Sequence, residues 1–409
     1  MMSNVIKNTT SLFVMNIAKI IFPLITLPYL TRVLSVEIYG NVSYVKALMA
    51  YMQIFVDFGF ILSATKDIVK AQNDKDEIGK ILVHTMIAKI ILGCIAFVIM
   101  IICCFIIPIL KQNFIFTILM FIPVFLTIFL ADFFFQGIEE MHILTFRFVL
   151  MRGISTLLTF FLVKNNSDLY YVAILDIAST GVAVVITWIE IKKYNIKLIF
   201  VSFGSVINQI TESAVYFLSN MASTAFSALN TILIGIFVSA SDVAYWSVAI
   251  QVVSAVQALY TPITNGIYPE MIKIKSMQLL YKICAIFTPA IIVGCIIIFN
   301  YSNIILLILG GEKYLEAIPV LKAFIPLLFC SFYAMLFGWP ALGAIGKVKE
   351  TTTTTVITAI VQMMGLFILI FTKHFTIVNV AFLRGITEFF MLSLRYRYCI
   401  LFREEFGKL

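Results

Sequence analysis

The 409 residues of this chain are 62% hydrophobic and only 12% charged, whereas a soluble domain carries about 25% charged residues. So few charges do not cover a water-facing surface, so a soluble enzyme is excluded and hydrocarbon must be the solvent for most of the chain. The formal net charge of +8 does not by itself indicate nucleic-acid binding, because Lys and Arg collect on the cytoplasmic side of membrane proteins.

Hydropathy predicts an all-α polytopic membrane protein with about twelve transmembrane helices. The first six spans are expected at residues 11–33, 39–63, 82–107, 114–136, 147–163 and 169–189. The second six are expected at residues 213–238, 243–267, 283–300, 317–342, 351–371 and 375–394. The apolar stretch 302–316 is too short to cross, and we expect an interfacial helix there.

The basic residues predict that both termini are cytoplasmic. With the N-terminus inside, 18 of the 29 Lys and Arg residues fall in cytoplasmic segments, five fall outside and six fall within spans. A bias that persists through alternate loops supports the span count, because a missed span would invert it downstream. The basic stretch Glu190–Lys197 separates two groups of six spans, which predicts an N-terminal lobe at 1–197, a C-terminal lobe at 198–394 and a cytoplasmic basic tail at 395–409.

Charged residues inside spans are costly, so each needs a physical reason. Lys46, Gln53 and Asp57 follow one another at i, i+7 and i+11, which is one face of a helix. Because this stripe holds both a cation and a carboxylate, it indicates the wall of an aqueous cavity. Lys19 lies eight residues inside the first span and is a second candidate for lining a cavity, with an internal ion pair to Asp57 as the alternative.

Other charges in the spans leave more alternatives open. Lys89, Arg152 and Lys322 lie near predicted span ends, where a long side chain reaches the headgroups by snorkelling. Asp132 and Asp176 have no evident partner in the sequence. Either is a candidate for proton or ion coupling, or for an ion pair with Arg152 or Lys89 across helices.

The second half carries its own polar candidates. Arg384 and Glu388 lie one turn apart in the last span. Arg384 is a candidate for the substrate path and Glu388 a candidate for coupling. The alternative is that the two charges only neutralise each other. Uncharged residues at helical spacing add substrate-path candidates, with helix-to-helix packing as the alternative. These are Asn220, Ser227, Asn230 and Gln251.

No pattern indicates a catalytic, metal or cofactor site, and we expect a protein that is not an enzyme. There is no Gly-x-x-x-x-Gly-Lys-Ser/Thr run for a nucleotide, so uphill transport would use an ion gradient or a product sink. The three histidines are scattered, and the seven cysteines form no Cys-x-x-Cys pair.

Five runs of the sequence carry a resemblance to a known family. The runs are PLITLPYLTRVL at Pro23–Leu34, VDFGF at Val56–Phe60, LSATKD at Leu62–Asp67, FQGIEEM at Phe135–Met141 and LGGEKY at Leu309–Tyr314. Together they resemble the bacterial polysaccharide repeat-unit translocases, the O-antigen flippase family. This resemblance implies the multidrug/oligosaccharidyl-lipid/polysaccharide exporter fold, with two six-helix lobes around a central cavity lined mainly by spans one, two, seven and eight.

The resemblance also implies a function. It implies a flippase of the bacterial plasma (inner) membrane that moves undecaprenyl-diphosphate-linked oligosaccharide by alternating access, for O-antigen, lipopolysaccharide or other surface polysaccharide, with the polymerase machinery as a partner. Lys19, Lys46 and Arg384 would then offset the diphosphate charge. Asn220, Asn230 and Gln251 would bond to sugar hydroxyls.

Two alternatives remain, one a transporter of the same fold and one from a different class. An ion-coupled multidrug/cation antiporter of the same fold would want acidic groups to dominate the cavity, whereas Lys19 and Lys46 are at least as deep as Asp57. A membrane-embedded glycan polymerase would show a large outward loop, and the predicted outward loops are short.

Overall fold

The computed structural model describes residues 2–71 and 74–407, which form helices and short connections and contain no β-strand. The chain divides into two compact units, Met1–Thr224 and Ala225–Leu409. The division falls inside α10 (Phe203–Phe237), which contributes residues to both units. A lobe boundary at 197/198 stays a prediction.

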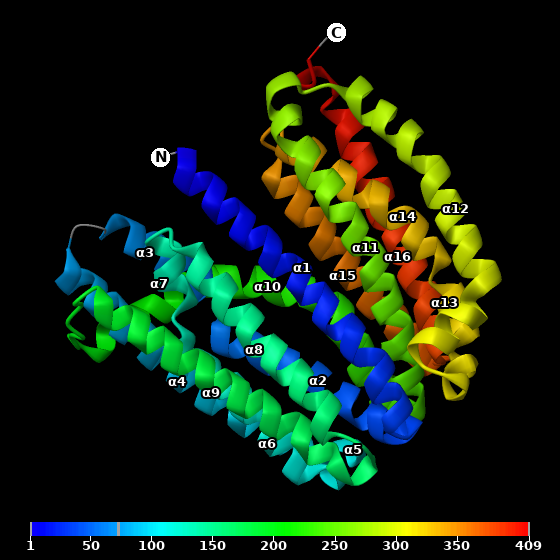
Figure 1. Cartoon of the computed structure of the whole chain (residues 1–409). Coiled ribbons are helices and arrows are strands. Elements are labelled where there is room, and N and C mark those ends of the chain that lie inside the picture. The colour runs from blue at the N-terminus through cyan, green and yellow to red at the C-terminus, as the bar shows by residue number, and fades with distance from the viewer. Residues whose placement is uncertain (1, 72–73, 408–409) are drawn as a thin grey trace. The chain divides into compact units, whose positions relative to one another are not determined.

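The first unit is a bundle of helices that pack side by side (Figure 1). Its main helices are α1 (Met2–Val33), α2 (Val36–Asp57), α4 (Lys75–Ile106), α6 (Phe114–Leu126), α8 (Met141–Leu162) and α9 (Leu169–Lys193). The shorter elements are α3 (Phe60–Lys70), α5 (Pro108–Gln112), η1 (Thr127–Leu130), α7 (Asp132–Gly137) and η2 (Asn166–Asp168). Helix α1 packs on α8, α8 on α9, α9 on α6 and α6 on α2, and α1 makes a smaller contact with α2.

A glycine breaks the second expected span between α2 and α3. Gly59 has φ +82°, in the left-handed region that favours glycine. A Cβ atom at Gly59 would also lie 2.5 Å from the Cβ of Tyr216 and 3.1 Å from the carbonyl oxygen of Ser213 on α10. Only a residue without a side chain fits here, and Ser63 and Ser213 join the same contact through a 2.6 Å hydroxyl–hydroxyl hydrogen bond.

The fourth expected span is also broken, and an arginine stabilises the break. Ala131 has φ +47°, which ends η1 and begins α7. Arg147 on α8 is 4% exposed. Its Nη1 donates to the carbonyl of Leu130 at 2.7 Å and to Thr187 Oγ1 at 2.7 Å. Its Nη2 forms an ion pair with Asp132. Arg147 therefore lies buried at this break. Asp132 pairs with Arg147 and not with Arg152 or Lys89.

The second unit, like the first, consists of long helices together with a helix that is broken by non-helical backbone. Its helices are α11 (Ala240–Ile274), α12 (Met277–Leu309), α13 (Ile318–Ala323), α14 (Ile325–Leu336), α15 (Val348–Phe371) and α16 (Ile377–Leu401), with turns η3 (Glu312–Ala317), η4 (Phe337–Gly343) and η5 (Arg403–Glu405). The expected interfacial helix at 302–316 stays a prediction. After a kink at Tyr301, residues 302–309 continue α12, and a 3-10 turn follows.

The broken helix of the second unit is also held by an arginine. Gly338 leaves the helical region with ψ −111°. Arg395 on α16 donates to the carbonyl of Ala334 at 2.5 Å, to Thr354 at 3.3 Å and to Thr355 at 3.0 Å. We counted Arg395 with the basic tail, whereas it is buried inside α16; the side on which the tail lies stays a prediction.

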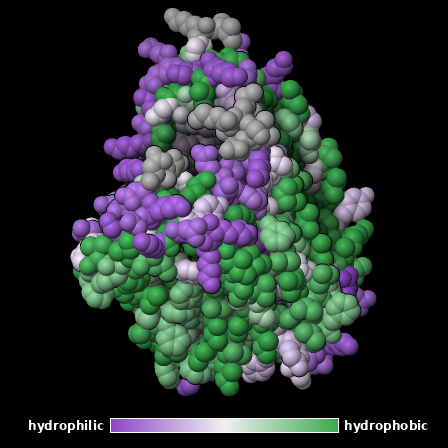
Figure 2. Space-filling model, turned by 60° about the vertical axis from the view of Figure 1, so that its left-hand side comes forward, coloured by the Kyte–Doolittle hydropathy of each residue, from purple (hydrophilic) through white to green (hydrophobic). Residues whose placement is uncertain are grey.

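The helix flanks carry the hydrophobic surface that a bilayer requires. Large apolar side chains are exposed on both units, among them Phe105 at 68%, Phe161 at 69% and Phe371 at 83%. Figure 2 shows a continuous hydrophobic surface on the face in view, with hydrophilic side chains gathered in a separate zone. Eleven helical segments of the described residues are long and apolar enough to cross a membrane, and α10 adds a shorter apolar stretch at Ala228–Phe237. The expected all-α membrane protein with about twelve spanning helices is confirmed.

Candidate substrate-binding cavity

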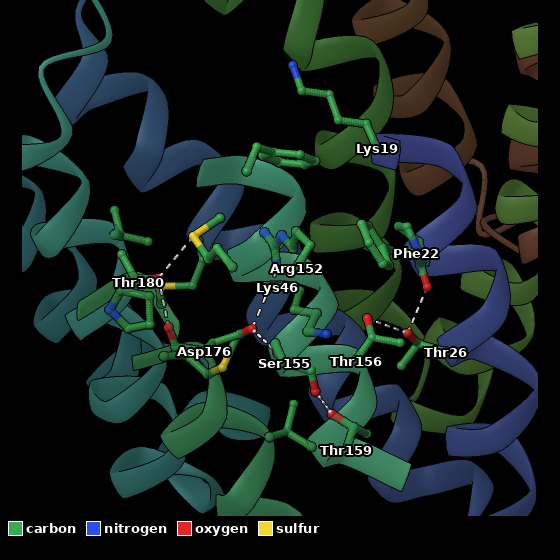
Figure 3. A pocket seen from close by; sticks show the side chains of 18 of the residues that line it. Lys19, Phe22, Thr26, Lys46, Arg152, Ser155, Thr156, Thr159, Asp176 and Thr180 are labelled. Atoms are coloured by element: carbon green, nitrogen blue, oxygen red, sulfur yellow. Dashed lines mark hydrogen bonds and ion pairs between the residues drawn. The ribbon is translucent and has the colours of Figure 1, made fainter. Parts of the chain in front are cut away.

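The helices of the first unit line a cavity of about 540 Å³ (Figure 3). Its walls come from α1, α2, α6, η1, α8 and α9. The polar lining residues are Lys19, Thr26, Lys46, Gln53, Thr127, Arg152, Ser155, Thr156, Thr159, Asp176 and Thr180. This volume falls in the range of small-molecule binding sites, about 300–1,000 Å³.

Positive charge dominates the cavity. Lys19, Lys46 and Arg152 contribute three cations from three different helices, and Asp176 is the one carboxylate among the described lining residues. Each charge sits on a helix that spans the membrane by length and composition. Because charges at this depth are expensive unless a partner or water compensates them, an excess of cations in a cavity indicates an anionic ligand.

Asp176 lies at the centre of the polar group. Its Oδ1 accepts a hydrogen bond from Ser155 Oγ at 3.0 Å and lies 3.4 Å from Nη1 of Arg152. Figure 3 shows Arg152, Ser155 and Asp176 turned toward one another, with Lys46 beside them.

Lys19 and Lys46 therefore both line the cavity, but at different places. The Lys19 ammonium lies 5.7 Å from the centre of the Phe148 ring, within cation–π range. In Figure 3 it points away from the group formed by Lys46, Arg152 and Asp176. The cavity thus offers one compact cationic cluster and one separate cation.

The predicted stripe of α2 divides between the cavity and its border. Gln53 lines the cavity and donates to Asp57 Oδ2 at 2.9 Å and to Thr127 Oγ1 at 2.9 Å. Asp57 is not among the lining residues, and its Oδ1 pairs with Lys89 at 3.0 Å. The alternative pairing of Lys19 with Asp57 is therefore wrong, and Lys89, which we expected to snorkel, has a buried side chain that closes this ion pair.

Hydroxyl groups line much of the remaining wall. Thr26 donates to the carbonyl of Phe22 at 2.7 Å, Thr159 to that of Ser155 at 2.7 Å and Thr180 to that of Asp176 at 2.7 Å. Each of these hydroxyls therefore donates a hydrogen bond to a carbonyl of its own helix, and its oxygen lone pairs can still accept hydrogen bonds. Such a wall suits a ligand that carries many hydroxyl donors.

Sequence reasoning missed the contribution of α8. Arg152 was assigned to snorkelling, yet it lines the cavity together with Ser155, Thr156 and Thr159. A signal was present, because Arg152, Ser155 and Thr159 occur at i, i+3 and i+7 on one helical face. Depth from a predicted span end carries no information on which way a side chain points.

The candidates of the second half lie elsewhere. Asn230 is fully buried, and its Oδ1 accepts from Gln362 Nε2 at 3.0 Å, while Thr387 donates to Gln362 Oε1 at 2.8 Å. Gln251 is half-buried on α11. The side chains of Asn220 and Ser227 lie outside the described residues. Roles in a substrate path stay predictions for all four.

The charged pair of the last span lies on α16. Glu388 is 6% exposed, and Arg384 is half-buried one turn before it. Arg395, also on α16, is buried as well. Among the described residues, no three His, Cys, Asp or Glu side chains gather as metal ligands would.

The fold and the cavity define a multi-pass membrane protein of a transporter architecture. Residues 5–275 match the family described as "Polysaccharide biosynthesis protein", and the chain belongs to that family. The predicted resemblance is thereby confirmed. A "Putative O-antigen transporter" of Shigella dysenteriae is 27% identical over 89% of this chain and 93% of its own, and one of Escherichia coli (strain K12) is 26% identical over 88% and 89%.

Solved structures share the fold at low identity. The inward-facing conformation of a multidrug resistance MATE family transporter of the MOP superfamily has a TM-score of 0.68 at 13% identity, covering 95% of this chain and 99% of that one. The lipid II flippase MurJ in its inward closed conformation has a TM-score of 0.67 at 12% identity, covering 97% and 87%. At these identities the likeness establishes the fold alone.

Proposed function

We propose that this chain is a flippase that translocates undecaprenyl-diphosphate-linked oligosaccharide repeat units across the bacterial inner membrane, by alternating access. The observation that carries the proposal is the cavity inside membrane-spanning helices with three cations against one carboxylate, Asp176. The relatives described as O-antigen transporters support the same substrate class.

The cavity chemistry matches the two polar parts of such a lipid. A diphosphate diester carries negative charge, which Lys46 and Arg152 offset as a cluster and Lys19 offsets from its separate position. The sugar chain carries many hydroxyl donors, which suit the acceptor oxygens of Thr26, Thr159 and the neighbouring threonines. The polyprenyl tail stays in the bilayer against the exposed apolar flanks.

The second unit supplies further candidates for the same path. We keep Arg384 as a candidate for the diphosphate and Asn220, Ser227, Asn230 and Gln251 as candidates for the sugars. Of the four expected coupling acids, Asp57 and Asp132 form ion pairs with Lys89 and Arg147. Asp176 is also paired, with Arg152, but unlike Asp57 and Asp132 it lines the cavity. We therefore assign coupling to Asp176 and keep Glu388 as a second candidate.

The alternatives fit the cavity less well. A drug/cation antiporter needs a site that attracts cations, whereas this cavity repels them. A glycan polymerase needs catalytic groups in a sizeable extramembrane region, whereas the connections between the described helices are short.

Complementation of a deletion strain tests the proposal. Deletion should abolish surface polysaccharide and leave lipid-linked repeat units inside the cell, and the wild-type gene should restore both. Lys46→Ala should fail to restore export, Lys46→Arg should restore most of it, and Lys192→Ala, which removes an exposed lysine at the end of α9, should restore all of it. Normal export by a normally expressed Lys46→Ala variant contradicts the role of this lysine.

A further inference from the structure

Asp176 stands in the place that an anionic ligand would take. It is the one carboxylate among the described residues that line the cavity, and Ser155 and Arg152 on α8 both face its Oδ1. The carboxylate is largely buried, with 15% of its side chain exposed, whereas Arg152 exposes 46%. The cation is therefore more accessible to an incoming ligand than the carboxylate that holds it.

The charges around Asp176 come from several helices. Lys19 on α1, Lys46 on α2 and Arg152 on α8 face the cavity, while α6, η1 and the rest of α9 add only uncharged residues to the described lining. The ion pair to Arg152 is loose, since 3.4 Å exceeds the 2.7–2.9 Å typical of charge-assisted hydrogen bonds. A loose pair leaves room for a second anion to compete.

We propose that Asp176 is an internal counter-ion that competes with the diphosphate of the substrate for Arg152 and Lys46. Ligand binding draws the two cations away and leaves the buried carboxylate unpaired, so that it takes up a proton. Anion binding and proton uptake at this cavity therefore favour each other. This inference rests on the proposed function and adds a regulation of the same site.

The physical basis is the cost of an uncompensated charge in a dry site. An ionised carboxylate without a partner is disfavoured relative to its neutral form, and the neutral acid still hydrogen-bonds to Ser155. Linkage is reciprocal, so whatever factor proton binding adds to the affinity for the anion, the anion adds to the affinity for the proton. No bond to carbon or phosphorus changes in this step; one proton moves from solvent to the carboxylate.

Binding of a nucleotide sugar to the purified chain in lipid nanodiscs tests the inference. UDP-N-acetylglucosamine keeps a constant charge from pH 6 to pH 8, because its diphosphate diester lacks the ionisation near pH 6 of a terminal phosphate. The wild-type chain should bind it more tightly at pH 6 than at pH 8. Asp176→Asn should bind about tenfold more tightly than wild type at pH 8 and should lose the pH dependence.

Two variants and one further measurement keep the outcomes distinct. Asp176→Glu should retain the pH dependence, and Glu190→Gln, which neutralises an acid on the same helix outside the cavity lining, should behave as wild type. Calorimetry of the wild type in two buffers of different ionisation enthalpy should record proton uptake on binding.

The failures of the two proposals differ. This inference alone is overturned if Lys46→Ala weakens binding but the wild type takes up no proton on binding. It is also overturned alone if Lys46→Ala weakens binding but Asp176→Asn gains no affinity. Absence of binding in the wild type and in Asp176→Asn, or binding that Lys46→Ala leaves unchanged, overturns the anion site of the proposed function and this inference with it.

Discussion

Arg147 and Arg395 play the same part in the two units. Each is buried and donates to a main-chain carbonyl beside a helix break, that of Leu130 for Arg147 and that of Ala334 for Arg395. Each also donates to threonine hydroxyls of the neighbouring helix. A carbonyl freed by a break inside a bilayer needs a donor, so these arginines allow non-helical backbone at membrane depth.

Replacement of Arg395 by lysine should destabilise the chain. One ammonium does not reach the carbonyl of Ala334 and both hydroxyls of Thr354 and Thr355 at once, so buried partners are left unsatisfied at a cost of about 1–3 kcal/mol each. We expect a clearly lower Tm for purified Arg395→Lys. The matched control is Arg397→Lys, two residues along the same helix and exposed; equal Tm values for the two variants would contradict the role of Arg395.

The pair of Lys89 and Asp57 should respond asymmetrically to mutation. The Lys89 side chain is 7% exposed and that of Asp57 is 42% exposed. Asp57→Asn leaves a buried cation without its partner, whereas Lys89→Met leaves a carboxylate that solvent reaches. We expect Asp57→Asn to lower the Tm more than Lys89→Met, and the double variant to recover part of the loss. Additive losses in this double-mutant cycle would show that the two charges do not interact.

Gly59→Ala should test the close approach of α10 to the α2–α3 break. The new methyl group would meet Tyr216 at 2.5 Å, in addition to the cost of a left-handed backbone. Gly346 is a matched control, since it has φ +81° but no atom within 4 Å of a Cβ. Gly346→Ala should cost about 1–2 kcal/mol, and Gly59→Ala should cost clearly more. Similar costs in chemical unfolding would rule out the steric part of the explanation.

Arg152 gives a prediction that separates cavity lining from snorkelling. If it lines the site, Arg152→Gln should reduce export of surface polysaccharide severely, and Arg152→Lys should retain a part of it. Lys322, whose ammonium lies 4.7 Å from the Phe299 ring in the second unit, provides the comparison, and Lys322→Gln should export normally. Normal export by a well-expressed Arg152→Gln variant would contradict a role in the cavity and favour the interpretation that Arg152 snorkels to the headgroups.

Helical spacing and hydropathy in the sequence were enough to predict the long helices and several residues of the candidate site. Lys46 and Gln53 were predicted from helical spacing and Lys19 from its depth in the first span, and all three line the cavity. Periodicity reports which residues share a face of one helix. Hydropathy likewise located the long helices, because their length is fixed by the bilayer.

Features that depend on contacts between distant segments were not predictable in this way. Lys89 meets Asp57 across 32 residues, and Arg147 meets Thr187 across 40, so no local pattern reveals either pair. The break at Ala131 has no sequence signal, since alanine seldom adopts a left-handed conformation. Tyr301 has a non-helical backbone inside α12, and hydropathy placed its division at the same point, between the expected span 283–300 and the stretch 302–316.

The central claim is that the cationic cavity of the first unit carries the diphosphate of a glycan lipid. Translocation of a fluorescent undecaprenyl-diphosphate-linked oligosaccharide in liposomes containing the purified chain measures this most directly. The account predicts transfer between leaflets by the wild type and by Lys192→Ala, and loss of transfer in Lys46→Ala and Arg152→Gln. Equal transfer rates in all four proteins would contradict it.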